Sequence, residues 1–146
     1  MIHDAVTQLQ PCESGTDRQQ SILIVDDDRA QVEALAIRLQ KQGFATVLAH
    51  EGRCGLKLAQ ERRPDLVLLD LRLPDADGFE ICGRLVDSPD TCHIPIIIVS
   101  GSDEPDIVRS ARAAGCQFFI GKPYDPNALL TLIEHALRHD SQDWLA

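Results

Sequence analysis

Five short apolar runs, separated by stretches with helical spacing, constrain the fold of this chain more than any other feature of its sequence. The runs lie at Ile22–Val25, Phe44–Ala49, Leu66–Leu69, Ile96–Val99 and Phe118–Ile120. Most of them do not alternate between apolar and polar residues, which is typical of strands covered on both faces in a parallel sheet. We therefore predict five parallel strands.

The segments between these runs carry helix signals. Val32, Leu35, Ala36 and Leu39 recur at helical spacing, and Gly43 closes that helix. The other expected helices are Gly52–Arg62, one capped by Asp77 with Glu80, one running from Asp103-Glu104-Pro105 to Gly115, and one opened by Asp125-Pro126. Strict alternation of strands and helices predicts an α/β fold, with a parallel sheet covered by helices on both faces.

The chain of 146 residues suits one domain. We place that domain at residues 21–139, after a polar extension at 1–20 and before a tail at 140–146 whose Trp144 we expect to pack back on the domain. No signal peptide or membrane span is visible, and the five cysteines form no C-x-x-C pair. We therefore expect a cytoplasmic protein with unpaired thiols.

Polar residues follow four of the predicted strands. Asp26-Asp27-Asp28 follows the first strand, Asp70 the third, Ser100 the fourth and Lys122 the fifth. Ligands of parallel sheets bind beyond the carboxyl ends of the strands, so we expect these residues to meet. The second strand ends in His50-Glu51, for which no chemical partner is evident, and Asp28 is expected to cap a helix.

The acidic residues predict a metal site that handles phosphate. Asp26, Asp27 and Asp70 would repel one another without a cation, and Mg²⁺ (with Mn²⁺ as an alternative ion) prefers such oxygen ligands. Lys122 can supply a point charge and Ser100 a hydroxyl to phosphoryl oxygens. Asp70 is then the candidate carboxylate nucleophile, which accepts the phosphoryl group.

Four segments resemble one known family. They are Ile22–Asp27, Pro64–Gly78 (PDLVLLDLRLPDADG), Ile94–Gly101 (IPIIIVSG) and Lys122–Tyr124 (KPY). Together they resemble the receiver domain of response regulators, the phosphoacceptor module of two-component signalling, over roughly residues 21–139. The resemblance implies a flavodoxin-like fold with strand order 2-1-3-4-5, and a signalling domain rather than an enzyme. It leaves two possibilities open, a single-domain regulator or a receiver domain cut from a longer protein.

The resemblance also implies a role for each site residue. Asp27 would bind Mg²⁺ directly, Asp26 through water, and Arg72 through its backbone carbonyl. Ser100 and Lys122 would bind the phosphoryl group carried by Asp70. The family further implies a cis peptide at Lys122-Pro123.

Two more positions bear on the response to phosphorylation. Phe119 occupies the family's switch position, where tyrosine is more common, and would turn inward when Ser100 moves. Phe118 should point to the opposite face. Arg72 is unusually long and cationic for its position. Its side chain could pair with Asp70 and slow hydrolysis of the acyl phosphate, and the alternative is a solvated surface arginine.

Predicted partners follow from the resemblance and from the charge. The family implies a histidine kinase or histidine phosphotransfer protein as phosphodonor, a downstream protein effector, and homodimerisation through the face formed by the helix ending at Gly115, the strand 118–120 and the last helix. The net charge of −9, from 23 acids and 14 bases, predicts that neither nucleic acid nor a membrane is a partner.

Two other readings of the sequence stay open at this point. Asp26-Asp27-Asp28 also resembles the D-x-D opening of haloacid-dehalogenase-type phosphatases, with Asp26 as nucleophile and Asp28 as acid/base. That assignment leaves Asp70 without a role. The chain could also be a receiver-like interaction module that works without phosphorylation.

Overall fold

The computed structural model describes residues 18–101, 106–116 and 118–142. Their strands and helices, in chain order, are β1 (Ser21–Val25), α2 (Arg29–Lys41), β2 (Ala45–Ala49), α3 (Gly52–Arg62), β3 (Leu66–Asp70), α4 (Gly78–Asp87), β4 (Ile96–Ser100), α5 (Ile107–Ala113), β5 (Phe118–Gly121) and α6 (Pro126–Gln142). The expectations for Trp144, for residues 1–17 and for the helix start at Asp103–Pro105 lie outside the described residues.

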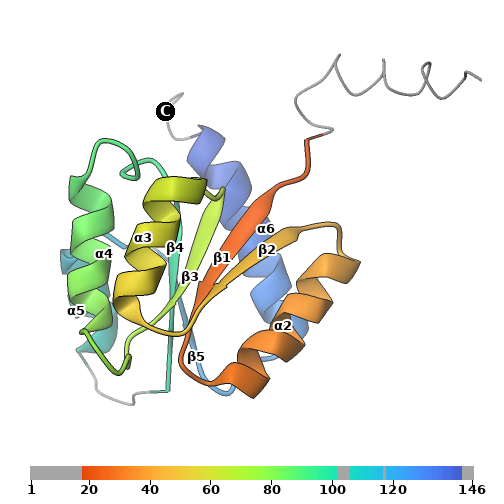
Figure 1. Ribbon diagram of the computed structural model, residues 1–146, viewed down its shortest axis with the longest axis horizontal. Helices are drawn as coiled ribbons and strands as arrows, with labels where there is room; N and C mark the ends of the chain where they lie inside the picture. The colour runs from red at the N-terminus through yellow and green to blue at the C-terminus, as the bar shows by residue number, and fades with distance from the viewer. Residues whose placement is uncertain (1–17, 102–105, 117, 143–146) are drawn as a thin grey trace, which may run out of the picture.

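The five strands form one parallel sheet in the order β2-β1-β3-β4-β5, as the resemblance implies. Helices α3, α4 and α5 cover one face, and α2 and α6 cover the other (Figure 1). The predicted α/β class and the predicted strand order are therefore confirmed. The reversal of strand order lies between β1 and β3, where such sheets bind ligands.

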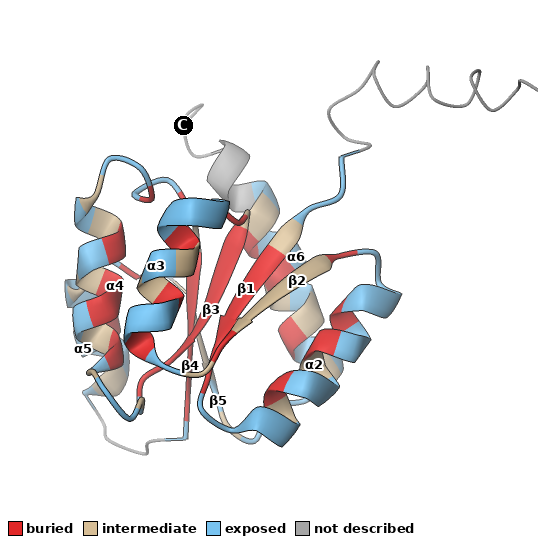
Figure 2. Cartoon of the chain, in the orientation of Figure 1, coloured by how far each residue is buried: buried red, intermediate tan, exposed pale blue. Residues whose placement is uncertain are grey.

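Two hydrophobic cores explain why the apolar runs do not alternate. In β1, Leu23 and Val25 belong to the core under α3, α4 and α5, whereas Ile22 and Ile24 belong to the core under α2 and α6. β3 and β4 divide their residues in the same way, so the central strands are buried on both faces (Figure 2). Phe118 and Phe119 of β5 likewise pack against opposite cores, as predicted.

Three aspartates anchor the starts of helices near the carboxyl edge of the sheet. Asp28 accepts a hydrogen bond from Gln31 N and caps α2, as predicted. Asp77 caps α4 by accepting from Phe79 N. Helix α3 has no such bond from its own cap residue; instead Asp75 accepts from the backbone N–H groups of Gly52 and Arg53, at 2.7 and 3.0 Å.

Candidate functional site

The parallel register gathers the predicted site residues at one edge of the sheet. Asp70 is the last residue of β3, and Ser100 is the last residue of β4. Asp70 pairs in register with Val99, the residue before Ser100, and Ser100 pairs with Gly121, the residue before Lys122. The backbone N–H of Lys122 donates to the carbonyl of Ser100 at 2.8 Å.

Three carboxylates form the acidic part of the site. One oxygen from each of Asp26, Asp27 and Asp70 lies within 4.8 Å of the others. Asp26 and Asp70 are buried, each with 7% of its surface exposed, whereas Asp27 is exposed. Asp27 also lines a hollow of about 360 Å³ that includes His50. This group can bind a metal ion, and Asp27 can contact it from the solvent side.

Lys122 joins the two buried carboxylates. Its Nζ donates to Asp26 Oδ2 at 2.9 Å and to Asp70 Oδ2 at 3.1 Å. Burial alone would lower the pKa of Lys122, but the hydrogen bonds to Asp26 and Asp70 outweigh it, and the pKa is raised. The ammonium group therefore stays charged at neutral pH and partly neutralises both acids.

Asp70 is under opposing electrostatic influences. Burial raises its pKa, and the charge of Asp26 adds to this effect. The N–H of Arg72, which donates to Asp70 Oδ1 at 3.1 Å, and the ammonium of Lys122 lower it, but the pKa remains above its ordinary value. Each oxygen of Asp70 thus accepts one hydrogen bond, and the carboxylate is held in one orientation.

The loop that carries Asp26 is fixed by its backbone. Asp26 N donates to the carbonyl of Ala49, and Asp28 N donates to Asp26 Oδ1, both at 3.0 Å. His50 Nδ1 lies 3.2 Å from the carbonyl oxygen of Asp26, within hydrogen-bonding distance for the tautomer protonated at Nδ1. His50 follows β2 directly, but a histidine bound to a backbone carbonyl 24 residues away leaves no signature in a sequence.

The segment after Asp70 turns sharply under the site. Gly78 N donates to the carbonyl of Leu71 at 3.0 Å, and Arg72 pairs with Asp77 in an isolated bridge. A Cβ on Gly78 would lie 2.6 Å from the carbonyl oxygen of Asp70 and 2.6 Å from Leu71 Cα. Only glycine therefore allows α4 to start so close to the end of β3.

The expected contact between the side chain of Arg72 and Asp70 is not what the structure shows. Arg72 is exposed, and among the described residues the cation that forms an ion pair with Asp70 is Lys122. Arg72 instead reaches Asp70 through its backbone N–H. The reason is geometric: a residue two positions after Asp70 meets its carboxylate through the tight turn of the main chain.

The two predicted switch residues lie next to this edge. Ser100 is buried, with 1% of its surface exposed. Phe119 is half-buried against the core under α3, α4 and α5 and pairs in register with Ile98 on β4. The Lys122-Pro123 peptide bond is cis, as the resemblance implies.

Comparison with known proteins decides the family. The sequence profile of the response regulator receiver domain matches residues 22–134. The chain belongs to this family. It is 36% identical over 124 residues to the transcriptional regulatory protein AfsQ1 of Streptomyces coelicolor, and 36% identical over 127 residues to the DNA-binding response regulator MtrA of Mycobacterium tuberculosis. These matches cover 84% and 86% of this chain, but 53% and 54% of the relatives.

Solved receiver structures share the fold. A CheY-like receiver domain protein of Methanospirillum hungatei superposes with a TM-score of 0.81 at 27% identity, over 86% of this chain and 99% of that one. The receiver domain of a signal transduction histidine kinase from Syntrophus aciditrophicus gives a TM-score of 0.76 at 31% identity, over 82% and 90%. Members of the response regulator receiver family typically signal rather than catalyse.

One predicted partner class needs correction. We expected no nucleic acid as partner, yet relatives of this receiver are named as DNA-binding response regulators. The expectation relied on the net charge of −9. The chain spans about half the length of these relatives, so the charge of the matched stretch does not exclude nucleic acid.

Among the helices of the described residues, none combines the length and apolar character that crossing a bilayer requires.

Proposed function

We propose that this receiver domain is a Mg²⁺-dependent phosphoacceptor whose modified residue is Asp70. The observation that carries the proposal is the bridging position of Lys122, which bonds both Asp26 and Asp70 at the carboxyl edge of the sheet. Such an arrangement supplies a carboxylate nucleophile, a cation beside it and further oxygen ligands for a metal. The exposed Asp27 borders the hollow from which a donor can approach.

In this proposal the metal is held by Asp26, Asp27, Asp70 and the backbone carbonyl of Arg72. Mg²⁺ suits this set of oxygen ligands, and Mn²⁺ is the alternative ion. When bound, the ion supplies positive charge against the phosphoryl oxygens. Lys122 adds a second cation on the protein side, and Ser100 supplies a hydroxyl group that donates to a phosphoryl oxygen.

The proposed transfer balances with a phosphohistidine donor. An oxygen of Asp70 attacks phosphorus, an O–P bond forms and the N–P bond of the donor breaks. The donor ring takes up one proton and leaves as neutral imidazole, on a histidine kinase or a histidine phosphotransfer protein. Hydrolysis returns the domain to its unphosphorylated state. Water attacks phosphorus, inorganic phosphate is released, and Asp70 is again a carboxylate.

The proposed switch uses the neighbouring strands. A phosphoryl group on Asp70 would attract the Ser100 hydroxyl, and the displacement would reach Phe119 through the pairing of β4 with β5. Beryllofluoride, which mimics the phosphoryl group, should therefore shift the NMR signals of Ser100 and Phe119. Unchanged signals at both residues in a protein that binds beryllofluoride would contradict the switch.

Acetyl phosphate with Mg²⁺ tests the acceptor function. Intact-protein mass spectrometry should show one added phosphoryl group on the wild type and on Asp75→Asn, which alters a carboxylate bound to α3 instead. Asp70→Asn should show none. Modification of Asp70→Asn would favour the phosphatase alternative, with Asp26 as nucleophile. Absence of modification in every protein would favour a module that works without phosphate.

We further propose that the phosphorylated state serves gene regulation, because the relatives include named DNA-binding response regulators. DNA recovered by cross-linking to the wild-type protein in its own cells should be enriched in defined sequences. Asp70→Asn should lose that enrichment. Equal recovery of random DNA by both proteins would contradict a transcriptional output.

A further inference from the structure

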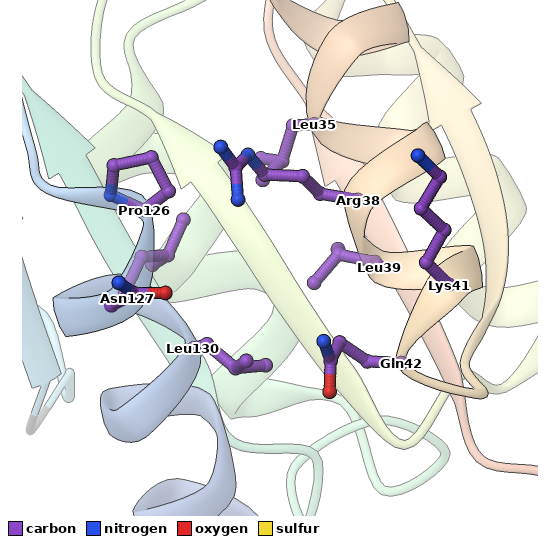
Figure 3. Close-up of a pocket in the computed structure, with 9 residues that line it drawn as sticks. Leu35, Arg38, Leu39, Lys41, Gln42, Pro126, Asn127 and Leu130 are labelled. Atoms are coloured by element: carbon purple, nitrogen blue, oxygen red, sulfur yellow. The ribbon is translucent and has the colours of Figure 1, made fainter.

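A groove lies between α2 and α6 (Figure 3). These two helices cover the face of the sheet opposite α3, α4 and α5 (Figure 1). Its volume is about 310 Å³. Leu35 and Leu39 of α2 and Leu129 and Leu130 of α6 supply apolar lining. The polar part of the lining consists of Arg38, Lys41, Gln42 and Asn127. A pocket near 300 Å³ is of the size that holds a small molecule.

Arg38 gives this groove a cationic group. Its side chain extends from α2 across the groove toward Pro126 of α6 (Figure 3). Arg38 also lines an adjoining hollow of about 230 Å³ that reaches Pro123 and Tyr124. Arg38 therefore lies where the two hollows meet, together with Leu35 and Pro126.

The positive charges at this groove are not neutralised by acidic side chains among the described residues. Lys41, in the last turn of α2, is a second cation in the lining. Among the described residues, neither Arg38 nor Lys41 forms an ion pair, although the chain carries 23 acids against 14 bases. A positive charge is stabilised near the C-terminus of a helix, which explains why basic residues stand at the end of α2. It does not explain why a partly apolar hollow lies beside them.

We propose that the groove between α2 and α6 is a binding site for a small amphipathic carboxylate. The carboxylate would accept two hydrogen bonds from the guanidinium group of Arg38, and the apolar body of the ligand would cover Leu35 and Leu130, which are partly exposed. Guanidinium groups bind carboxylates in this two-point geometry. None of the acidic site residues lines the groove, so this site is separate from the proposed phosphoacceptor site.

Octanoate serves as the probe, with 1-octanol as its uncharged counterpart. Titration of the ¹⁵N-labelled full chain, below the micelle concentration of octanoate, should give saturable amide shifts at residues lining the groove. Octanoate should bind more tightly than 1-octanol, because only octanoate pairs with Arg38. Arg38→Gln should weaken octanoate binding about fivefold to tenfold and leave binding of 1-octanol unchanged.

Arg62→Gln is the matched control, since Arg62 is also a basic residue in the last turn of a helix, α3, and lies outside the groove. It should bind octanoate like the wild type. The proposal would be overturned by the absence of a saturable shift, by equal affinity for octanoate and 1-octanol, or by equal weakening in Arg38→Gln and Arg62→Gln. Shifts that depend on protein concentration rather than on octanoate would assign the groove to a second copy of the chain, and also overturn it.

Discussion

The ammonium group of Lys122 lies 3.1 Å from Oδ2 of Asp70, although the two residues are 52 positions apart in the chain. The same ammonium bonds Asp26 at 2.9 Å. One lysine thus neutralises part of the charge of two buried acids that a metal ion would also bind. This relationship couples metal binding, proton binding and phosphoryl transfer in the proposed mechanism.

Lys122→Met should separate metal binding from phosphoryl transfer. Loss of the cation leaves Asp26 and Asp70 without their shared partner. Mg²⁺ should therefore bind about tenfold more tightly, which corresponds to the removal of about 1.4 kcal/mol of repulsion between the ammonium group and the metal ion. Acyl phosphate formation should be lost. Calorimetry with Mg²⁺ and mass spectrometry after acetyl phosphate measure the two effects. Lys57→Met, which removes an exposed lysine paired with Glu61, should change neither; weaker Mg²⁺ binding by Lys122→Met would contradict this account.

Asp70→Asn should stabilise the metal-free protein at neutral pH. The raised pKa of Asp70 means that its folded carboxyl group binds a proton more tightly than the unfolded chain does. Ionisation therefore costs stability as pH rises through the folded pKa, and that cost is absent below the unfolded value of 3.8. Urea unfolding in EDTA should show a higher midpoint for Asp70→Asn than for the wild type at pH 7, and this difference should disappear below the unfolded pKa of 3.8. A loss of stability at pH 7 would contradict the sign of this effect.

Asp75→Asn should change the stability of the protein with the opposite sign to Asp70→Asn at neutral pH. Hydrogen bonds from the N–H groups of Arg53 and Gly52 lower the pKa of Asp75. A lowered carboxyl pKa contributes stability that is present above 3.8 and is lost as pH falls through the folded value. The variant should therefore unfold at lower urea concentration at pH 7 and match the wild type at low pH. Amide exchange at Gly52 and Arg53 should also become several-fold faster at pH 7; unchanged exchange would show that Asp75 does not hold the start of α3.

Gly78→Ala should destabilise the fold by about 1–3 kcal/mol, because its Cβ would overlap backbone atoms at the end of β3. Gly83→Ala is the matched control within the same helix, α4. No atom lies within 4 Å of a Cβ at that position. Replacing a glycine in the interior of a helix should stabilise the protein by about 0.5–1 kcal/mol. Equal effects of the two substitutions in urea unfolding would contradict the close approach at Gly78.

Arg72→Ala should accelerate loss of the phosphoryl group several-fold. The guanidinium group is exposed and carries no bond to Asp70 in this state, so it stays free to shield an acyl phosphate from water. Release of phosphate from the modified protein, followed in Mg²⁺ buffer, measures this rate. Arg53→Ala, which removes an exposed arginine from α3, is the control. An unchanged rate in Arg72→Ala would remove the kinetic role of this side chain.

The sequence predicted most of the fold because burial on two faces leaves a strong signal. β1, β3 and β4 read as continuous apolar runs, and the residues after them meet because parallel strands end at one edge. The proximity of Asp70 to Lys122 follows from that rule alone.

Contacts that depend on the course of the backbone were not predictable. His50 meets a carbonyl oxygen, and Asp75 binds the start of a helix more than twenty residues before it. Arg72 was expected to use its side chain but uses its N–H. Net charge did not predict the class of partner, because it describes this chain alone, whereas the relatives named as DNA-binding are about twice the length that it matches.

The site of phosphorylation is the most direct test of the central claim. After treatment with acetyl phosphate and Mg²⁺, sodium borohydride reduces an aspartyl phosphate to homoserine, which tandem mass spectrometry locates in the peptide. We predict homoserine at position 70, with Asp26, Asp27 and Asp28 intact. Homoserine at position 26, or at no aspartate of a protein that has taken up phosphate, would contradict the assignment of Asp70 as the phosphoacceptor.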